Sequence, residues 1–79
     1  MSSSGKRKLT QQEEEYLRHM IPHHQLAVDM SVELLKTSND SNLIQMCRTI
    51  IWQQKYEIWL MTDMLNNGTG WSSSLFDQE

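Results

Sequence analysis

Hydrophobic residues recur at helical spacing along two stretches of the chain. The first stretch follows Thr10-Gln11-Gln12-Glu13, a capping-box sequence in which the Thr hydroxyl and the Glu carboxylate satisfy free backbone N–H groups reciprocally. Apolar side chains then return every three or four residues as far as Thr37, which predicts a helix over residues 11–37. The recurring positions are Tyr16, Leu17, Met20, Ile21, His23, Ala27, Val28, Met30, Val32, Leu34 and Leu35.

Pro22 interrupts this first pattern. A proline inside a helix removes one hydrogen bond and clashes with the carbonyl four residues back, here that of Arg18. We expect a kink near residues 18–22, because the apolar stripe keeps its phase across the proline. The alternative is a true break, with Pro22 opening a second helix.

The second apolar stretch predicts a helix over residues 40–67, after a polar connection that offers Ser38, Asn39 and Asp40 as N-caps. Asn66-Asn67-Gly68 ends it, because Asn and Gly accept the left-handed conformation. A connection this short predicts an antiparallel helical hairpin, and so an all-α fold over residues 10–68. We expect residues 1–9 to be disordered, and residues 69–79 to form a C-terminal tail that docks through Trp71, Leu75 and Phe76 or stays loose.

Both helices have apolar faces wider than one neighbouring helix covers. We therefore expect a two-fold homodimer that completes a four-helix bundle. Trp52 and Trp59, seven residues apart, lie away from the Met/Glu edge of the second helix and predict another contact surface, covered by the tail or by a protein partner.

Length, charge and cysteine content exclude several classes of protein. The chain has 79 residues, a formal net charge of −3 and one cysteine, so it forms at most one small domain without an internal disulfide. No basic cluster exceeds Lys6-Arg7-Lys8, which argues against nucleic acid as the main partner. No run of about 18 apolar residues predicts a membrane span. The first residues have no hydrophobic signal-peptide core, so an intracellular location is expected.

Three histidines lie within six positions, and the pairs His19/His23 and Met20/His24 are each one helical turn apart. Imidazoles together with thioethers suit copper as Cu(I) or Cu(II), and imidazoles with a carboxylate alone suit zinc. We expect His19 and His23 to be the primary ligands, and Glu57 to be a ligand or the acceptor that orients an imidazole. The full candidate set is His19, Met20, His23, His24, Met30, Glu57 and Met61, with Gln54 beside them.

A metal-free alternative stays open on the same residues. His, Gln54 and Glu57 would then form a buried hydrogen-bond network in a structural or protein-interaction module, with Trp52 and Trp59 as the partner surface. Enzymatic activity is not expected. A di-iron centre uses Glu-x-x-His pairs, whereas the residues three before the histidines are Tyr16, Met20 and Ile21, and Cys47 is expected to be a buried mid-helix residue.

Two segments resemble a known family. Leu17-Arg18-His19-Met20-Ile21-Pro22-His23-His24-Gln25, followed by Ala27-Val28-Asp29-Met30, and Gln54-x-x-Glu57-Ile58-x-x-Met61 resemble the domain of unknown function 305 family. The resemblance implies a ferritin-like helical fold, frequent export, and copper binding through His and Met in some members. Many members carry the hairpin twice, so the single copy here favours a dimer. Leu26 departs from the family, which commonly has Gly there, as do the bulky Trp52 and Trp59.

Overall fold

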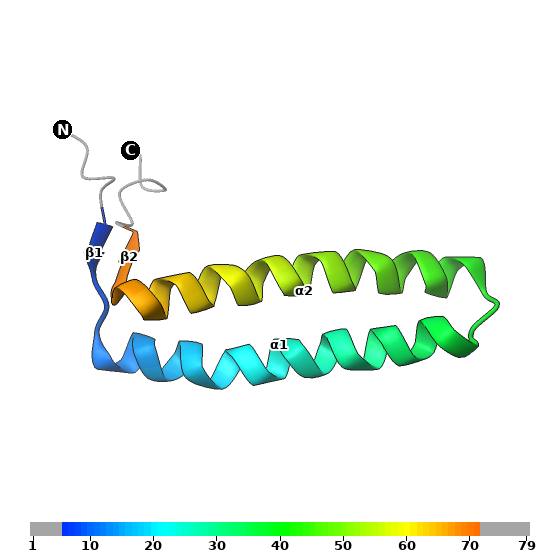
Figure 1. Cartoon of the computed structure of the whole chain (residues 1–79), viewed down its shortest axis with the longest axis horizontal. Helices are drawn as coiled ribbons and strands as arrows, with labels where there is room; N and C mark the ends of the chain where they lie inside the picture. Colours follow the sequence, from blue (N-terminus) through cyan, green and yellow to red (C-terminus); the bar gives the residue numbers. More distant parts are fainter. Residues whose placement is uncertain (1–5, 72–79) are drawn as a thin grey trace.

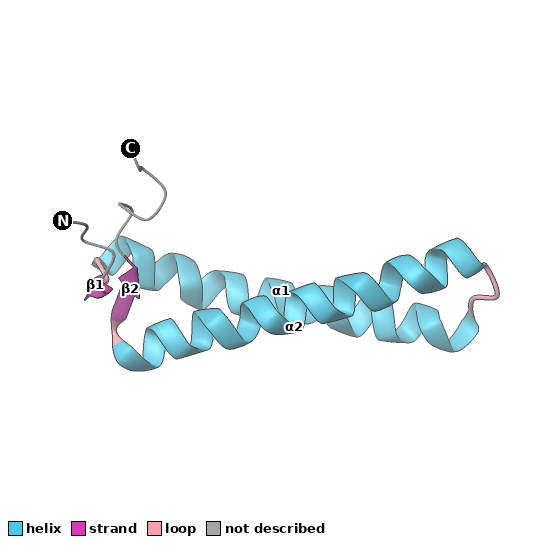
Figure 2. Cartoon of the chain, turned by 90° about the horizontal axis from the view of Figure 1, so that it is seen from above, coloured by secondary structure: helices cyan, strands magenta, loops and turns pink. Residues whose placement is uncertain are grey.

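A computed structural model describes residues 6–71, and its framework is a hairpin of two antiparallel helices (Figure 1). Helix α1 spans Gln11–Thr37 and helix α2 spans Ser41–Asn67, with residues 38–40 as the connection. Two short strands, β1 (Lys6–Lys8) and β2 (Thr69–Trp71), lie at the opposite end of the hairpin from this connection. Seen from above, the helices cross at a shallow angle (Figure 2). The predicted all-helical hairpin is confirmed.

Helix α1 begins at a capping box and contains Pro22 in its interior. The Thr10 hydroxyl accepts a hydrogen bond from the Glu13 N–H at 3.1 Å, and the Glu13 carboxylate accepts one from the Thr10 N–H at 2.9 Å, which confirms the capping box. The helix is continuous through Pro22. Pro22 therefore does not open a separate helix.

Helix α2 begins and ends at the expected signals. The Asp40 carboxylate accepts a hydrogen bond from the Leu43 N–H at 2.8 Å and caps the N-terminus. Gly68 ends the helix in the left-handed conformation, with φ of 66°, and its N–H donates to the Leu65 carbonyl at 3.2 Å.

The N-terminal segment differs from the expectation of disorder over residues 1–9. Strand β1 pairs antiparallel with β2, with Arg7 opposite Gly70, and the Leu9 N–H donates to the Gly68 carbonyl at 3.0 Å. The expectation is therefore wrong for residues 6–9. Backbone hydrogen bonds make this pairing, so the side-chain pattern of Lys6-Arg7-Lys8 carries no sign of it. Residues 1–5 and the tail residues Leu75 and Phe76 lie outside the described part.

Burial is concentrated near the strand end of the hairpin. Leu9, Leu17 and Met61 form a buried cluster, against which Met20 and Met64 pack. Beyond it, Val28, Ser31 and Cys47 are buried between the helices. Leu9, the residue that follows β1, therefore contributes to the core at the open end of the hairpin. Neither described helix is long and apolar enough to cross a membrane.

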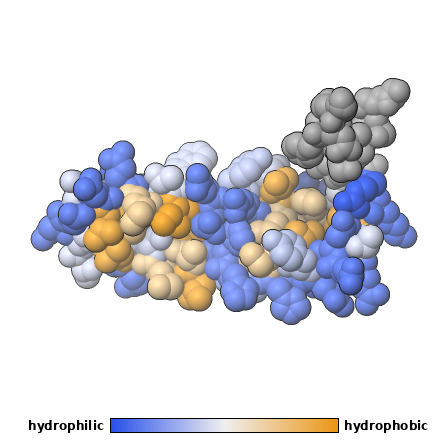
Figure 3. Space-filling view, turned by 180° about the vertical axis from the view of Figure 1, so that it is seen from behind, coloured by the Kyte–Doolittle hydropathy of each residue, from blue (hydrophilic) through white to orange (hydrophobic). Residues whose placement is uncertain are grey.

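One hairpin leaves much apolar surface in water. The shortest dimension of the molecule is 15 Å, close to the thickness of a single helix layer. Apolar side chains gather in two groups on the face drawn in Figure 3, with polar ones between them. Large hydrophobic residues that remain exposed are Tyr16, Leu26, Met30, Val32, Leu34, Leu43, Met46, Trp52, Tyr56 and Trp59.

Candidate functional site

His24 and Glu57 join the two helices halfway along the hairpin. The His24 Nε2 lies 2.6 Å from the Glu57 Oε1, and the His24 Nδ1 lies 2.9 Å from the Met20 carbonyl oxygen. The His24 side chain is 15% exposed and that of Glu57 is 48% exposed. The pair is thus half-buried, with the carboxylate at the edge of the solvent.

The Met20 carbonyl decides the hydrogen-bonding state of the imidazole. A carbonyl oxygen only accepts, so Nδ1 carries the proton and donates to it. Nε2 then forms a hydrogen bond with the Glu57 carboxylate when it is protonated as well, which makes an imidazolium–carboxylate ion pair. Without that proton, the Nε2 lone pair faces the carboxylate oxygens. The neutral imidazole with its proton on Nδ1 is the tautomer that binds a metal through Nε2, while the Nδ1–H donates to a carbonyl oxygen.

The other two histidines lie outside the contact between the helices. His19 and His23 are exposed, and the His19 Nδ1 donates to the Glu15 carbonyl at 2.8 Å. Their spacing places them one turn apart on α1. His23 lies one heptad after Tyr16 and one before Met30, so it projects from nearly the same side of the helix as those two residues. The structure therefore brings His24, rather than the two expected primary ligands, next to Glu57.

The candidate methionines divide into two groups. Met61 is 8% exposed, and Met20 packs against the cluster that contains Met61. Met20 lies one turn before His24 and Met61 lies one turn after Glu57, so both are displaced from the pair toward the strand end. Met30 is 64% exposed and lies about 9 Å along α1 from His24. Gln54 is half-buried one turn before Glu57, and no hydrogen bond between Gln54 and the pair occurs in the described structure.

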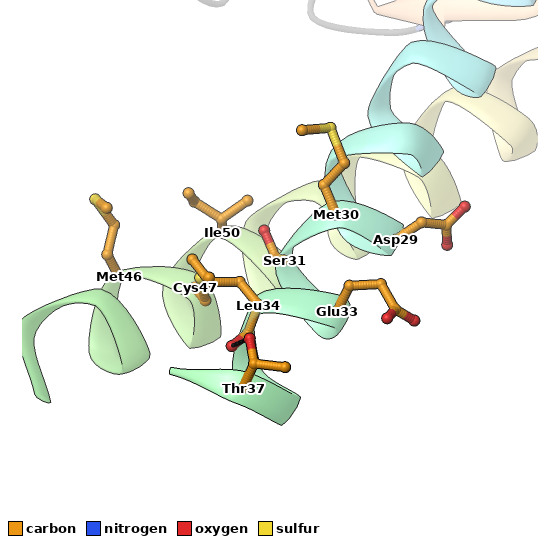
Figure 4. Close-up of a pocket in the computed structure, with 9 residues that line it drawn as sticks. All are labelled: Asp29, Met30, Ser31, Glu33, Leu34, Thr37, Met46, Cys47 and Ile50. Atoms are coloured by element: carbon orange, nitrogen blue, oxygen red, sulfur yellow. Dashed lines mark hydrogen bonds between the residues drawn. The ribbon is translucent and has the colours of Figure 1, made fainter. Parts of the chain in front are cut away.

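Met30 lines an apolar groove near the connection between the helices (Figure 4). The side chains of Met30, Met46 and Ile50 project from the same side of the hairpin, and Cys47 is buried beneath them, as expected. We call this hollow the loop-end groove. Its lining residues are Asp29, Met30, Ser31, Glu33, Leu34, Thr37, Met46, Cys47 and Ile50.

A second hollow, the strand-end groove, is lined by Tyr16, Leu17 and Met64 together with Leu9 and polar residues of the α1 N-terminus. Tyr16 lies two heptads before Met30, and Met64 lies two heptads after Ile50. Residues at this spacing project from nearly the same side of a helix. Both grooves therefore open on one face, the groove face, with the His24–Glu57 pair between them.

No group of three or more His, Cys, Asp or Glu side chains that could hold one metal ion occurs within residues 6–71. The pair supplies two donor atoms of the types that bind zinc and Cu(II), an imidazole nitrogen and a carboxylate oxygen. The described part of one hairpin thus brings two such donor atoms together.

An ion pair at the strand end was missed by sequence reasoning. Arg7 contacts both carboxylate oxygens of Glu13, at 2.9 and 2.8 Å. The Arg7 hydrogen bond, and after it the Thr10 N–H, lowers the pKa of Glu13 to about 2, and Glu13 raises the pKa of Arg7. The basic run before an acidic first turn was the available signal. The pair holds β1 against α1.

The expected aromatic surface lies on the outer side of α2. Trp52 is 76% exposed and Trp59 is 62% exposed, and the Tyr56 ring stacks on Trp59 with centroids 6.3 Å apart. A shallow hollow beside Trp52 is lined only by α2 residues. This surface is separate from the groove face.

Comparison with known proteins identifies one family. A family model described as "Domain of unknown function (DUF305)" matches residues 1–65, a span that includes both the histidine cluster and Glu57. Comparisons with curated proteins and with solved structures found no match.

Proposed function

The chain belongs to the DUF305 family, and we propose that it is a non-enzymatic metal-binding module, with copper as the preferred metal and zinc as the second choice. The observation that carries this proposal is the convergence of the His24 Nε2 and the Glu57 Oε1 at 2.6 Å. One ligand comes from each helix, and the Met20 carbonyl holds the imidazole in the metal-binding tautomer.

The donor types around the pair support copper. Met20 and Met61 lie one turn away, and a thioether favours Cu(I), whereas the imidazole serves either oxidation state. Copper bound here would be held and passed on as an ion, and no covalent step on a substrate is involved. His19, His23 and Met30, the other candidate ligands, are exposed on α1 and are not assigned to this site.

We propose that the module works as a homodimer with a ferritin-like four-helix bundle. The support is the exposed apolar side of a single helix layer, including Met30 and Met46 of the loop-end groove. Burying such a side against a second hairpin is the arrangement that gives four-helix bundles their core.

A metal-free interaction module is the second candidate function. Both ring nitrogens of His24 already face acceptors, so the pair is complete as an ion pair without any metal. The exposed Trp52 and Trp59 would then bind a protein partner, since aromatic residues are enriched in such interfaces.

Titration of the full chain with Cu(I), Cu(II) and Zn²⁺ separates the two functions. We expect the wild type to bind copper at least tenfold more tightly than an unfolded peptide with the same residues, and a His24→Ala/Glu57→Ala variant to lose that difference. A His19→Ala/His23→Ala variant is the matched control for the exposed histidines. Affinity at the level of the unfolded peptide for all three ions would overturn the metal-binding proposal.

A further inference from the structure

We propose that the metal site is shared between two copies of this chain: a second hairpin covers the groove face, and its His24–Glu57 pair completes a four-ligand site at the two-fold axis. This inference rests on the proposed metal-binding function and adds to it the partner, the ligand set and the stoichiometry.

The His24–Glu57 pair lies near the middle of both helices. His24 is the middle residue of Gln11–Thr37, and Glu57 lies within one turn of the middle of Ser41–Asn67. The apolar grooves lie on either side, one toward the connection and one toward the strands. The groove face is therefore apolar, polar and apolar in sequence along its length.

Two-fold symmetry determines how the apolar and polar segments of two groove faces align. In a face-to-face dimer the two-fold axis lies in the plane between the hairpins, either along the helices or across them. When the hairpins overlap along their full length, both axes place the middle of one hairpin opposite the middle of the other. The two pairs then meet, and the apolar grooves face apolar surface.

Other registers are penalised by the same residues. A shift along the helices would place the Glu57 carboxylate against the apolar lining of a groove, and a charge buried without a partner is costly. When the middles of the two hairpins face each other, each Glu57 carboxylate stays beside its own imidazole and meets the polar pair of the partner instead of an apolar lining. Two helices about 40 Å long and about 10 Å apart offer roughly 800 Å², which is what one partner of a stable interface buries.

The chemistry of the joined pairs is that of a closed metal site. Two imidazole nitrogens and two carboxylate oxygens make four donors, the number that tetrahedral zinc uses and a set that also suits Cu(II). The described residues of one chain bring together only two of them. These four nitrogen and oxygen donors favour a divalent ion, zinc or Cu(II), at the shared site.

Sedimentation and titration of the full chain with Zn²⁺ alone test the inference. We expect one zinc per two chains, and a dimer dissociation constant at least tenfold lower with zinc than without. His24→Ala and Glu57→Gln should abolish this effect of zinc. Loss of the zinc effect in the His19→Ala/His23→Ala variant would instead assign the zinc to the exposed histidines.

A second pair of variants leaves all ligands in place. Met46→Glu introduces a charge into the loop-end groove, whereas Trp52→Glu introduces the same charge on the outer surface of the same helix, and both native side chains are exposed. We expect Met46→Glu to be monomeric and to bind zinc at least tenfold more weakly, and Trp52→Glu to match the wild type. Circular dichroism checks that helix content is kept, and Met30→Glu repeats the test from α1.

Failure of the shared site can be distinguished from failure of metal binding itself. One zinc per chain, bound equally well by Met46→Glu, would overturn the shared site and leave the proposed function standing. Binding that depends on His19 and His23 would have the same consequence. Absence of both zinc and copper binding would overturn the inference and the proposed function together.

Discussion

The His24 Nε2 lies 2.6 Å from the Glu57 Oε1 and makes the one side-chain hydrogen bond between α1 and α2 within residues 6–71. Apolar contacts are nearly non-directional, so they tolerate small sliding movements of one helix along the other. A short hydrogen bond between two fixed positions does not tolerate such sliding, because its two atoms would move apart. The pair therefore resists sliding of α1 along α2.

A double-mutant cycle measures this coupling. We expect His24→Ala and Glu57→Ala each to lower the free energy of unfolding, with an interaction energy of about 1 kcal/mol between them, since Glu57 is half exposed and water screens its charge. Urea unfolding of the four proteins at one fixed concentration provides the values. Additive effects of the two substitutions would show that the hydrogen bond contributes nothing to stability.

Leu9 anchors the N-terminal segment in the core. It is 6% exposed in the cluster with Leu17 and Met61, so Leu9→Ala should destabilise the fold by about 2 kcal/mol through lost burial and a residual cavity. Leu26→Ala is the control, because Leu26 is 56% exposed and its truncation should change stability by less than about 0.5 kcal/mol. Thermal unfolding compares the two. Equal effects would mean that β1 and Leu9 do not pack in solution.

Gly68 ends α2 with φ of 66°, and a Cβ placed there meets nothing within 4 Å. The cost of Gly68→Ala is therefore backbone strain alone, and we expect about 1 kcal/mol of destabilisation. Gly68→Asn should lose less, because Asn tolerates the left-handed conformation. Chemical denaturation of both variants gives the order, and a less stable Asn variant would contradict the assignment.

Acidification should weaken the strand end. The pKa of Glu13 is about 2 in the folded chain against an ordinary value of 4.5, so the folded state holds this proton more weakly than the unfolded state does. The stabilisation is complete above about pH 4.5 and is lost as the pH falls toward 2. We expect the Tm of the wild type to fall more steeply across this interval than that of Glu13→Gln. Parallel curves would show that the Arg7 contact does not form in solution.

The two helices could be predicted from the sequence, because their signals are local. The capping box at Thr10, the Asp40 cap and Gly68 each act within one turn. The pattern predicts the first and the last, and it offers Asp40 as one of three candidate caps. The burial of Cys47 also followed from its position on the apolar arc. Pro22 left two outcomes open, and the continuous packing of α1 against α2 is consistent with the unbroken helix.

Which histidine faces the second helix depends on how the two helices pack. Successive residues on a helix point about 100° apart, so His24 faces a different direction from His19 and His23, and the packing of α2 decides which direction meets the second helix. That selection put His24 beside Glu57 and left His19 and His23 exposed. Strand β1 was likewise beyond the sequence pattern, because its backbone bonds go to β2, about 60 residues away. Contacts of this range depend on how the hairpin brings its two ends together, and no local pattern encodes them.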